Sequence, residues 1–370
     1  MEGSAVSGYL GSEHTVSLEP VFNQLYSLVL LFKGKNMPGL PAWVQRTRER
    51  MPLEHLQRNR LVMDGLFYAF TTEAALPSFG AYLEHLQALA PQSYQDRLLA
   101  MYECASPGEC GFPDLEPTGS KDRSQILSSV NNYLAYLRKH FDSPHLDLDV
   151  EAQAYRYVTD PPAMKDLIIT HLREMWETYL APEWTMVRPM LSKVVDAFCA
   201  AGIATMSRRE AIQFVIGKEL PEASWAGQVD KAERIILAPS AHVGPYVGKF
   251  ISGRNLVLLF GARLPEGVDS DVPDASRAEI LTGLEALADD HRLQILRMAA
   301  DAGELRATEV MTALDISQSA ASRSLTQLTA TGYLTERRKD GGKIYGLNPS
   351  RIHNTISALS RYLSVTASGT

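Results

Sequence analysis

The sequence of 370 residues is long enough for two domains, and its 45% hydrophobic and 21% charged residues are ordinary for a globular protein. This composition excludes collagen-like, low-complexity and wholly disordered chains. The formal net charge of −7 argues against a protein that coats nucleic acid over its whole surface, but it leaves room for a local basic patch.

Cysteine content and hydropathy indicate where the protein works. Three cysteines, Cys104, Cys110 and Cys199, are too few for a disulfide framework and suit a reducing compartment. No signal peptide is visible at the amino terminus. The longest apolar run, Leu28 to Phe32, is far shorter than the ~20 residues that span a bilayer. We expect a cytoplasmic protein without a membrane partner.

Residues 1–263 are predicted to form one large, helical N-terminal domain. Apolar residues at helical spacing, with Ser or Pro near several starts such as Ser78, Ser120 and Ser207, predict helices at 18–32, 41–50, 53–70, 79–89, 94–104, 122–140, 163–179, 185–200 and 208–216. Two β-rich runs, 234–238 and 255–260, close the domain. The Pro and Gly residues between these runs predict a short, irregular β-hairpin. Residues 264–276 (LPEGVDSDVPDAS) have the composition of a linker.

Residues 277–365 are predicted to form a winged helix-turn-helix. One amphipathic helix is expected at 279–299, a second at 305–314 and a third at 318–330, which Gly332 follows. The buried side of the first helix is predicted to hold Ile280, Leu284, Leu287, Leu293, Leu296 and Met298. The segments LTERRKD and KIYGLN flank a turn at 340–342 and predict a hairpin. The fold class is therefore mainly α, with an α+β domain at the C-terminal end.

The third helix has the residue pattern of a DNA-recognition helix. Ala321, Leu325 and Leu328 form an apolar seam, and short polar or hydrogen-bonding side chains occupy the opposite face. Those predicted to contact double-stranded DNA are Gln318, Ser319, Ser322, Arg323 and Thr326, together with Ser317 at the helix start.

The hairpin adds a basic wing to this predicted interface. Its cations are Arg337, Arg338, Lys339 and Lys343, and we include Tyr345 of the second strand among the DNA-binding residues. Residues 317–350 carry a net charge of +3, whereas residues 276–316 carry −4. We expect the wing to neutralise phosphates, with affinity falling by about 0.9 log units per contact for each log unit of salt. Taken alone, a basic hairpin is also typical of a solvated surface.

The segments LADDHRLQIL, ISQSAASRSLTQL, GYL and GGKIYGL resemble the ArsR family of winged-helix repressors. The resemblance covers about 75 residues and implies repression by occupation of an operator. It also implies a homodimer built by the first and last helices of the domain. Ile352, Ile356, Leu359 and Leu363 follow an a/d-like spacing in the last helix, which either forms this dimer seam or packs on its own domain. The preceding region, including LFKGKNMPGLPAWVQRTRERMP, resembles longer ArsR-like regulators with an uncharacterised helical domain.

The chain departs from the metal-sensing members of that family. Residues 304–310 contain no Cys-x-Cys motif, and His353 is the only histidine in the last helix. Ser324 stands where many members have a histidine. Cys104-x5-Cys110 fits no compact zinc pattern. We therefore expect no metal and no cofactor.

Candidates for catalysis are weak, and the carboxylates of Asp147 and Asp149 are expected to be solvated loop residues. His171 and His242 stand alone in the sequence, and no Walker loop, G-x-S-x-G or H-E-x-x-H motif occurs. Trp176, Tyr179, Trp184, Met186, Met190 and Phe198 follow near-helical spacing that is typical of a core or, alternatively, of a pocket for a small-molecule effector. The sequence favours a dimeric repressor and not an enzyme. The alternative is a small-molecule-binding or enzyme domain fused to an autoregulatory DNA-binding domain.

Overall fold

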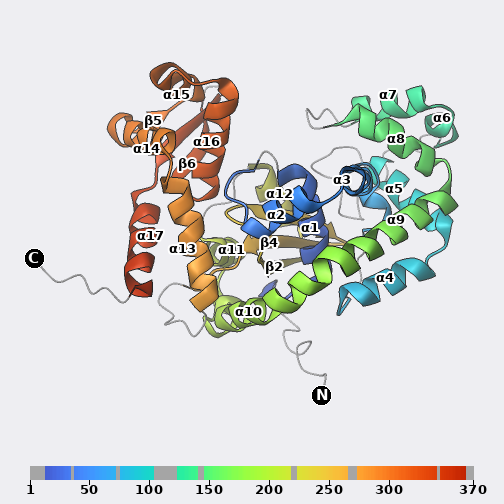
Figure 1. Cartoon of the computed structure of the whole chain (residues 1–370), viewed down its shortest axis with the longest axis horizontal. Helices are drawn as coiled ribbons and strands as arrows, with labels where there is room; N and C mark the ends of the chain where they lie inside the picture. The colour runs from blue at the N-terminus through green and yellow to red at the C-terminus, as the bar shows by residue number, and fades with distance from the viewer. Residues whose placement is uncertain are drawn as a thin grey trace, which may run out of the picture.

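The computed structural model describes residues 13–34, 37–71, 76–103, 123–140, 146–217, 223–265, 273–339 and 342–363. The protein is mainly α (Figure 1). No helix within these ranges is long and apolar enough to cross a bilayer. Cys104, Cys110, Ser120 and most of the predicted linker lie outside the described residues.

Helices are present at every position predicted for the N-terminal domain, but the one predicted at 122–140 is divided at residues 128–129, and two further helices were not predicted. The helices are α1 (Pro20–Lys33), α2 (Ala42–Arg50), α3 (Leu53–Arg60), α4 (Phe79–Ala88), α5 (Pro91–Glu103), α6 (Arg123–Leu127), α7 (Val130–His140), α8 (Leu148–Val158), α9 (Pro161–Met175), α10 (Ala181–Ala200), α11 (Arg208–Ile216) and α12 (Ala223–Lys231). The π-helical turns η2 (Leu61–Gly65) and η4 (Trp176–Leu180) extend α3 and join α9 to α10. Short 3₁₀ helices lie at η3 (Phe67–Ala69) and η5 (Ile203–Thr205). Neither α8 nor α12 was predicted.

Side-chain caps fix several of the helix starts. The Ser78 hydroxyl accepts from the Ala81 amide in α4, and Ser207 with Glu210 closes a capping box on α11. Asp147 was expected to be a solvated loop carboxylate. It is instead the N-cap of α8, where it accepts from the amides of residues 149 and 150 at 3.0 and 3.2 Å.

The predicted β-hairpin is wrong. The domain contains a four-stranded sheet of β1 (His14–Val16), β2 (Arg234–Ser240), β3 (Val247–Ser252) and β4 (Asn255–Gly261), in the order β1-β2-β4-β3. The two predicted runs, β2 and β4, pair in parallel, and the hairpin is β3–β4. The residues of β3 alternate between buried and half-buried positions, but in the sequence this alternation is a weak pattern among neighbouring Gly and Pro residues. The strand was therefore missed.

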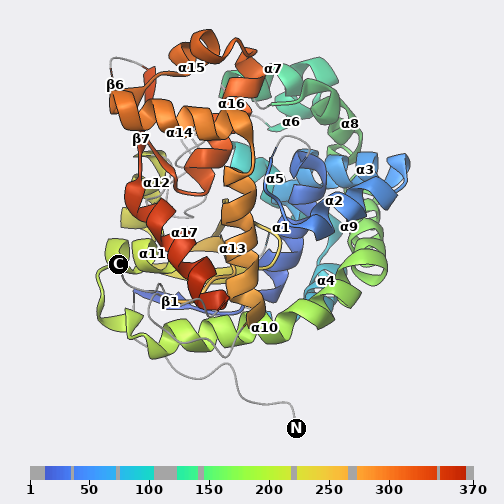
Figure 2. The ribbon, with the colours of Figure 1, turned by 60° about the vertical axis from the view of Figure 1, so that its left-hand side comes forward.

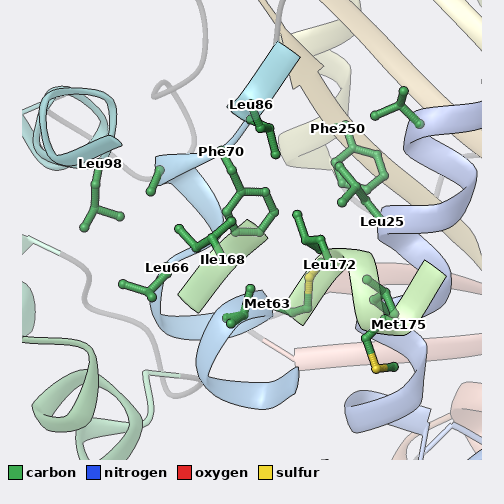
Figure 3. Close-up of a cluster of buried hydrophobic side chains, with 14 of the residues drawn as sticks. Leu25, Met63, Leu66, Phe70, Leu86, Leu98, Ile168, Leu172, Met175 and Phe250 are labelled. Carbon is green, nitrogen blue, oxygen red and sulfur yellow. The ribbon is translucent and has the colours of Figure 1, made fainter. Parts of the chain in front are cut away.

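Both faces of this sheet are covered by helices. The interior strand β4 is therefore buried on both sides, which explains its continuous apolar run. Leu256, Leu258 and Phe260 pack into one core with the second half of α10, α11 and β1. Val257 and Leu259 face a larger core built from α1, η2, α4, α5 and α9. Figure 3 shows this larger core, where Leu172 and Phe70 lie among the side chains of several helices.

The C-terminal region forms a winged helix-turn-helix with a core of its own. Its elements are α13 (Pro273–Leu287), α14 (Asp290–Ala302), β5 (Glu304–Leu305), α15 (Ala307–Leu314), α16 (Gln318–Ala330), β6 (Leu334–Lys339), β7 (Gly342–Leu347) and α17 (Pro349–Tyr362). β7 lies between β5 and β6 in an antiparallel sheet. The separate core includes Ile295, Leu325, Leu328 and Tyr333.

Two details of the C-terminal prediction are wrong. The helix expected at 279–299 is two helices, because Asp289 caps α14 by accepting from the Arg292 amide and Arg292 Nε donates back to the Ala286 carbonyl at 2.7 Å. This break changes the helical phase, so Leu293 is 50% exposed and Ile295 is buried instead. The last four residues of the predicted linker belong to α13.

The winged helix lies against one side of the N-terminal domain (Figure 1, Figure 2). α13 packs against both α17 and α10, so it stands between the last helix and the N-terminal domain. The end of α16 also reaches that domain. A side chain built on Gly39, whose φ is +78°, would meet the Gln327 amide nitrogen at 3.2 Å.

Candidate nucleic-acid interface

The recognition helix α16 has the predicted bounds, and its local sequence explains them. The Ser317 hydroxyl caps the helix by accepting from the Ala320 amide at 3.3 Å, and it also contacts the Ser319 hydroxyl at 3.0 Å. Gly332 follows the helix with φ at +82°, a left-handed conformation that glycine adopts without strain. Ala321, Leu325 and Leu328 are fully buried, which confirms the apolar seam.

The opposite face of α16 presents the predicted DNA-binding side chains to solvent. The exposed residues are Ser317, Gln318, Ser319, Ser322, Arg323 and Thr326. A row with steps of four, four and three residues runs from Ser319 through Arg323 and Gln327 to Ala330. The row is exposed at its start and buried at Gln327, whose side chain was not part of the predicted set. The face is therefore open over its N-terminal half and covered at its C-terminal end.

Carboxylates accompany the cations of the wing, which the prediction did not include. Arg337 and Lys339 both pair with Glu304 of β5, the latter at 3.1 Å, and Lys343 pairs with Glu336 at 2.8 Å. The hydrogen bond from Lys339 and the two nearby cations hold the pKa of Glu304 below its usual value. The side chain of Arg338 lies outside the described residues. Phosphate groups must therefore compete with Glu304 and Glu336 for the described wing cations.

This competition gives a testable expectation for Glu304→Gln. The substitution removes the carboxylate that holds two wing cations, so the variant should bind every duplex more tightly, by the modest amount expected for exposed ion pairs. Its plot of log K against log salt should be steeper than that of the wild type. Fluorescence anisotropy with labelled random duplexes at increasing salt measures both quantities. The exposed Glu49 in α2 supplies the control Glu49→Gln, and an unchanged slope in Glu304→Gln would contradict the competition.

The predicted role of Tyr345 in DNA contact is wrong. Its side chain is 7% exposed and packs in the core of the winged helix. Burial, followed by the neighbouring Glu336 carboxylate, raises the pKa of Tyr345 to about 12. Its position in β7 directs the ring toward the core of the winged helix, so Tyr345 stabilises the wing by packing beneath the hairpin.

The apolar side chains predicted to form a seam on the last helix, α17, are partly packed and partly exposed. Ile352 packs against the core of its own domain and Leu359 is half-buried, but Ile356 and Leu363 are 54% and 58% exposed. On α13, which packs beside α17, Leu281 is 47% exposed. Part of the predicted seam therefore packs within the domain, while Ile356 and Leu363 expose apolar side chains to solvent.

Comparison with known proteins supports the nature of this domain. The family model described as "Bacterial regulatory protein, arsR family" matches residues 289–336, from the cap of α14 into β6. The arsenic resistance transcriptional regulator ArsR2 of Pseudomonas putida is 37% identical over 87 residues, which are 22% of this chain and 76% of that protein. The chain belongs to the ArsR family.

Two further matches concern the same ArsR-family region. The arsenic resistance transcriptional regulator ArsR1 of Pseudomonas putida is 40% identical over 80 residues, 21% of this chain, and the chain spans 62% of its length. The crystal structure of the AntR antimony-specific transcriptional repressor matches 27% of this chain and 92% of its own chain, at 24% identity and a TM-score of 0.21. These matches each cover less than a third of this chain.

Metal-ligand chemistry at the ArsR-family positions has no support among the described residues. Residues 304–310 form β5 and the first turn of α15, and their side chains include no cysteine. Within the described ranges, no group of three or more His, Cys, Asp or Glu side chains could hold a metal ion. Cys199 is a half-buried free thiol in α10, and Cys104 and Cys110 lie outside the described residues.

Both of the histidines that stood alone in the sequence have partners in this ArsR-family protein. His171 Nε2 contacts the Asn59 side-chain oxygen at 3.1 Å, and burial lowers the pKa of His171 to about 3. His242 stacks on Trp43 with ring centroids 4.0 Å apart, and its two nitrogens contact Ser27 at 2.7 Å and Glu183 at 3.3 Å.

Proposed function

We propose that this chain is a sequence-specific DNA-binding transcriptional repressor that binds operator DNA as a homodimer. The observation that carries the proposal is the division of α16 into a buried apolar seam and an exposed face with Gln318, Ser322 and Arg323. Gln and Arg side chains on the face of a helix that enters the major groove can read base edges, while Ser317 and the free amides at the helix start suit phosphates. Family membership supports the same function.

The proposed dimer rests on exposed apolar side chains of α13 and α17. Leu281, Ile356 and Leu363 expose apolar surface to water in the monomer, and burial of that surface against a second copy would be favourable. Two copies would present two recognition helices to successive major grooves.

The proposal assigns no catalytic activity to the chain. Ser27, His242 and Glu183 have the residue types of a hydrolytic triad, and they are the strongest support for the alternative of an enzyme domain. Ser27, however, is 2% exposed and donates its hydroxyl proton to the Asn23 carbonyl at 2.7 Å. A substrate has no access to such a hydroxyl, so we assign these three residues to packing in the N-terminal domain.

The test is selection of bound sequences from random duplex DNA by the full chain. Enrichment of one motif that occurs twice, with centres about 10–10.5 base pairs or a multiple apart, is the expected result for a dimer. A single motif without a repeat would contradict dimeric binding. No enrichment at low salt would contradict the function itself.

Metals are not expected to control this binding. Because residues 304–310 carry no thiolate, Zn²⁺, Cd²⁺ and arsenite at micromolar concentrations should leave the affinity for the selected duplex unchanged. Fluorescence anisotropy titrations with and without each ion, after dialysis against a chelator, provide the measurement. A tightly bound stoichiometric ion that abolishes DNA binding would contradict this expectation and direct attention to Cys104 and Cys110.

A further inference from the structure

A cavity of about 120 Å³ lies between the N-terminal domain and the winged helix. We propose that it binds a small organic monocarboxylate with an apolar body and that this ligand controls the placement of α16. The N-terminal domain contributes most of the wall, including Met190, Phe260 and Arg263. The winged helix contributes residues of α13, the end of α16 and Arg351 of α17.

The polar part of the wall suits an anion. Arg263 is 7% exposed, and its Nη1 donates to the carbonyls of residues 214 and 215 at 3.1 and 3.4 Å, which holds the guanidinium at the end of α11. Arg351 Nε donates to the Thr331 carbonyl at 3.0 Å. Arginine is always charged, and its planar guanidinium is the side chain best suited to recognise a carboxylate. None of the described residues that line the cavity is an Asp or Glu.

The remaining wall and the size define the rest of the ligand. Met190, Ile216 and Phe260 are apolar, as are Pro41 and Pro245 on the side nearest α16. A cavity of about 150 Å³ lined by apolar side chains holds benzene. The space therefore suits an apolar body of similar or slightly smaller size than benzene.

The cavity is connected to the DNA-binding face through α16. Ala330 and Thr331 line the cavity, and one turn earlier Gln327 is 3% exposed against the loop that contains Gly39. The side-chain oxygen of Gln327 is buried without a hydrogen-bond partner among the described residues, an arrangement that disfavours this contact. A ligand that touches both domains would stabilise the contact and keep the C-terminal end of the recognition face covered. This step rests on the proposed function, and it predicts weaker DNA binding when the ligand is present.

Benzoate is the first probe, because it combines one carboxylate with a ring of suitable size, and benzamide is its neutral counterpart. Isothermal titration of the full chain without DNA should show saturable benzoate binding with a Kd of about 1 mM or tighter. Benzamide should bind at least about tenfold more weakly. Arg351→Gln should lose about tenfold in benzoate affinity, and Thr282→Met should lose as much by filling the space from α13. Arg297→Gln on the exposed side of α14 is the matched control and should bind as the wild type does.

Each result separates the site from the proposed function. Absence of saturable benzoate binding at about tenfold above 1 mM, equal binding of benzamide, or unchanged binding by both Arg351→Gln and Thr282→Met would overturn the site. If benzoate binds, saturation should weaken affinity for the selected duplex about 5- to 150-fold. Binding of benzoate without this loss would overturn the coupling to α16 and leave the ligand site standing. Failure of the chain to bind any DNA would contradict the proposed function, while the titration without DNA would still decide the site.

Discussion

Replacement of Arg323 by alanine should weaken binding to the selected duplex by about 1–3 kcal/mol, or about 5- to 150-fold. Arg323 is exposed in the second turn of α16, and the buried Ala321 and Leu325 fix its direction away from the core. A guanidinium in this position can donate two hydrogen bonds to a guanine edge, so its loss should also relax discrimination at one base position. Anisotropy titrations at fixed salt, with the selected duplex and with single-base variants of it, measure both effects.

The control for Arg323→Ala is Arg297→Ala. Arg297 is an exposed arginine of the same domain that pairs with Asp301 one turn along α14 at 3.0 Å. It carries the same charge but does not belong to α16. Equal affinity and equal base discrimination in Arg323→Ala and the wild type would remove Arg323 from the interface.

Replacement of Glu151 by glutamine should stabilise the N-terminal domain near neutral pH. Glu151 lies in α8, is 8% exposed and accepts a hydrogen bond from the Tyr133 hydroxyl at 3.1 Å. Burial raises the pKa of Glu151 from 4.5 to about 8, the carboxylates of Asp64 and Asp147 add to the rise, and the Tyr133 hydroxyl opposes it. In the unfolded chain the carboxyl ionises near its usual value, so folding between these two pKa values requires uptake of a proton.

The free energy of unfolding should therefore fall with pH because of this one group. The fall is about 1.4 kcal/mol per pH unit at most, it begins near pH 4.5 and it ends near pH 8. Glu151→Gln lacks the ionisation, so its stability relative to the wild type should rise over the same interval and be constant below it. The difference between the two proteins is the useful quantity, because the other titrating groups cancel.

Tryptophan fluorescence during urea denaturation measures this difference, since all four tryptophans, at positions 43, 176, 184 and 225, lie in the N-terminal domain. The exposed Glu49→Gln variant is the control and should track the wild type at every pH. A difference between Glu151→Gln and the wild type that stays constant across pH would show that Glu151 is ionised in the folded protein.

The parts of the fold that the sequence predicted well are those fixed by neighbouring residues. The bounds of α16 follow from the Ser317 cap and Gly332, and its buried side follows from helical spacing. The exposed DNA-binding face came from the same pattern. Asp147 carried a similar local signal for α8, which was missed because the carboxylate was interpreted as a loop residue.

The parts that were missed depend on contacts between distant segments. β1 pairs with β2 more than 200 residues later in the chain, and the parallel partner of β2 is β4 instead of an antiparallel neighbour. No local pattern specifies such pairings. The approach of Glu304 to Arg337 and Lys339 also depends on the placement of β5 beside the hairpin. The inward direction of Tyr345 depends on the register of β7, because a shift by one residue moves a side chain to the other face of a sheet. The exposure of Leu293 depends on the break between α13 and α14, which changes the helical phase.

The continuous helix formed by α9, η4 and α10 affects how the N-terminal domain unfolds. Leu172 on its first half belongs to the larger core, and Phe198 near its end belongs to the second core, on the other face of the sheet. The two cores share this helix and the four-stranded sheet, so unfolding of one core should also disrupt elements that pack in the other. Amide protons in both should therefore exchange with the solvent through a single, concerted opening, while those of the winged helix, which has its own core, follow a separate rate.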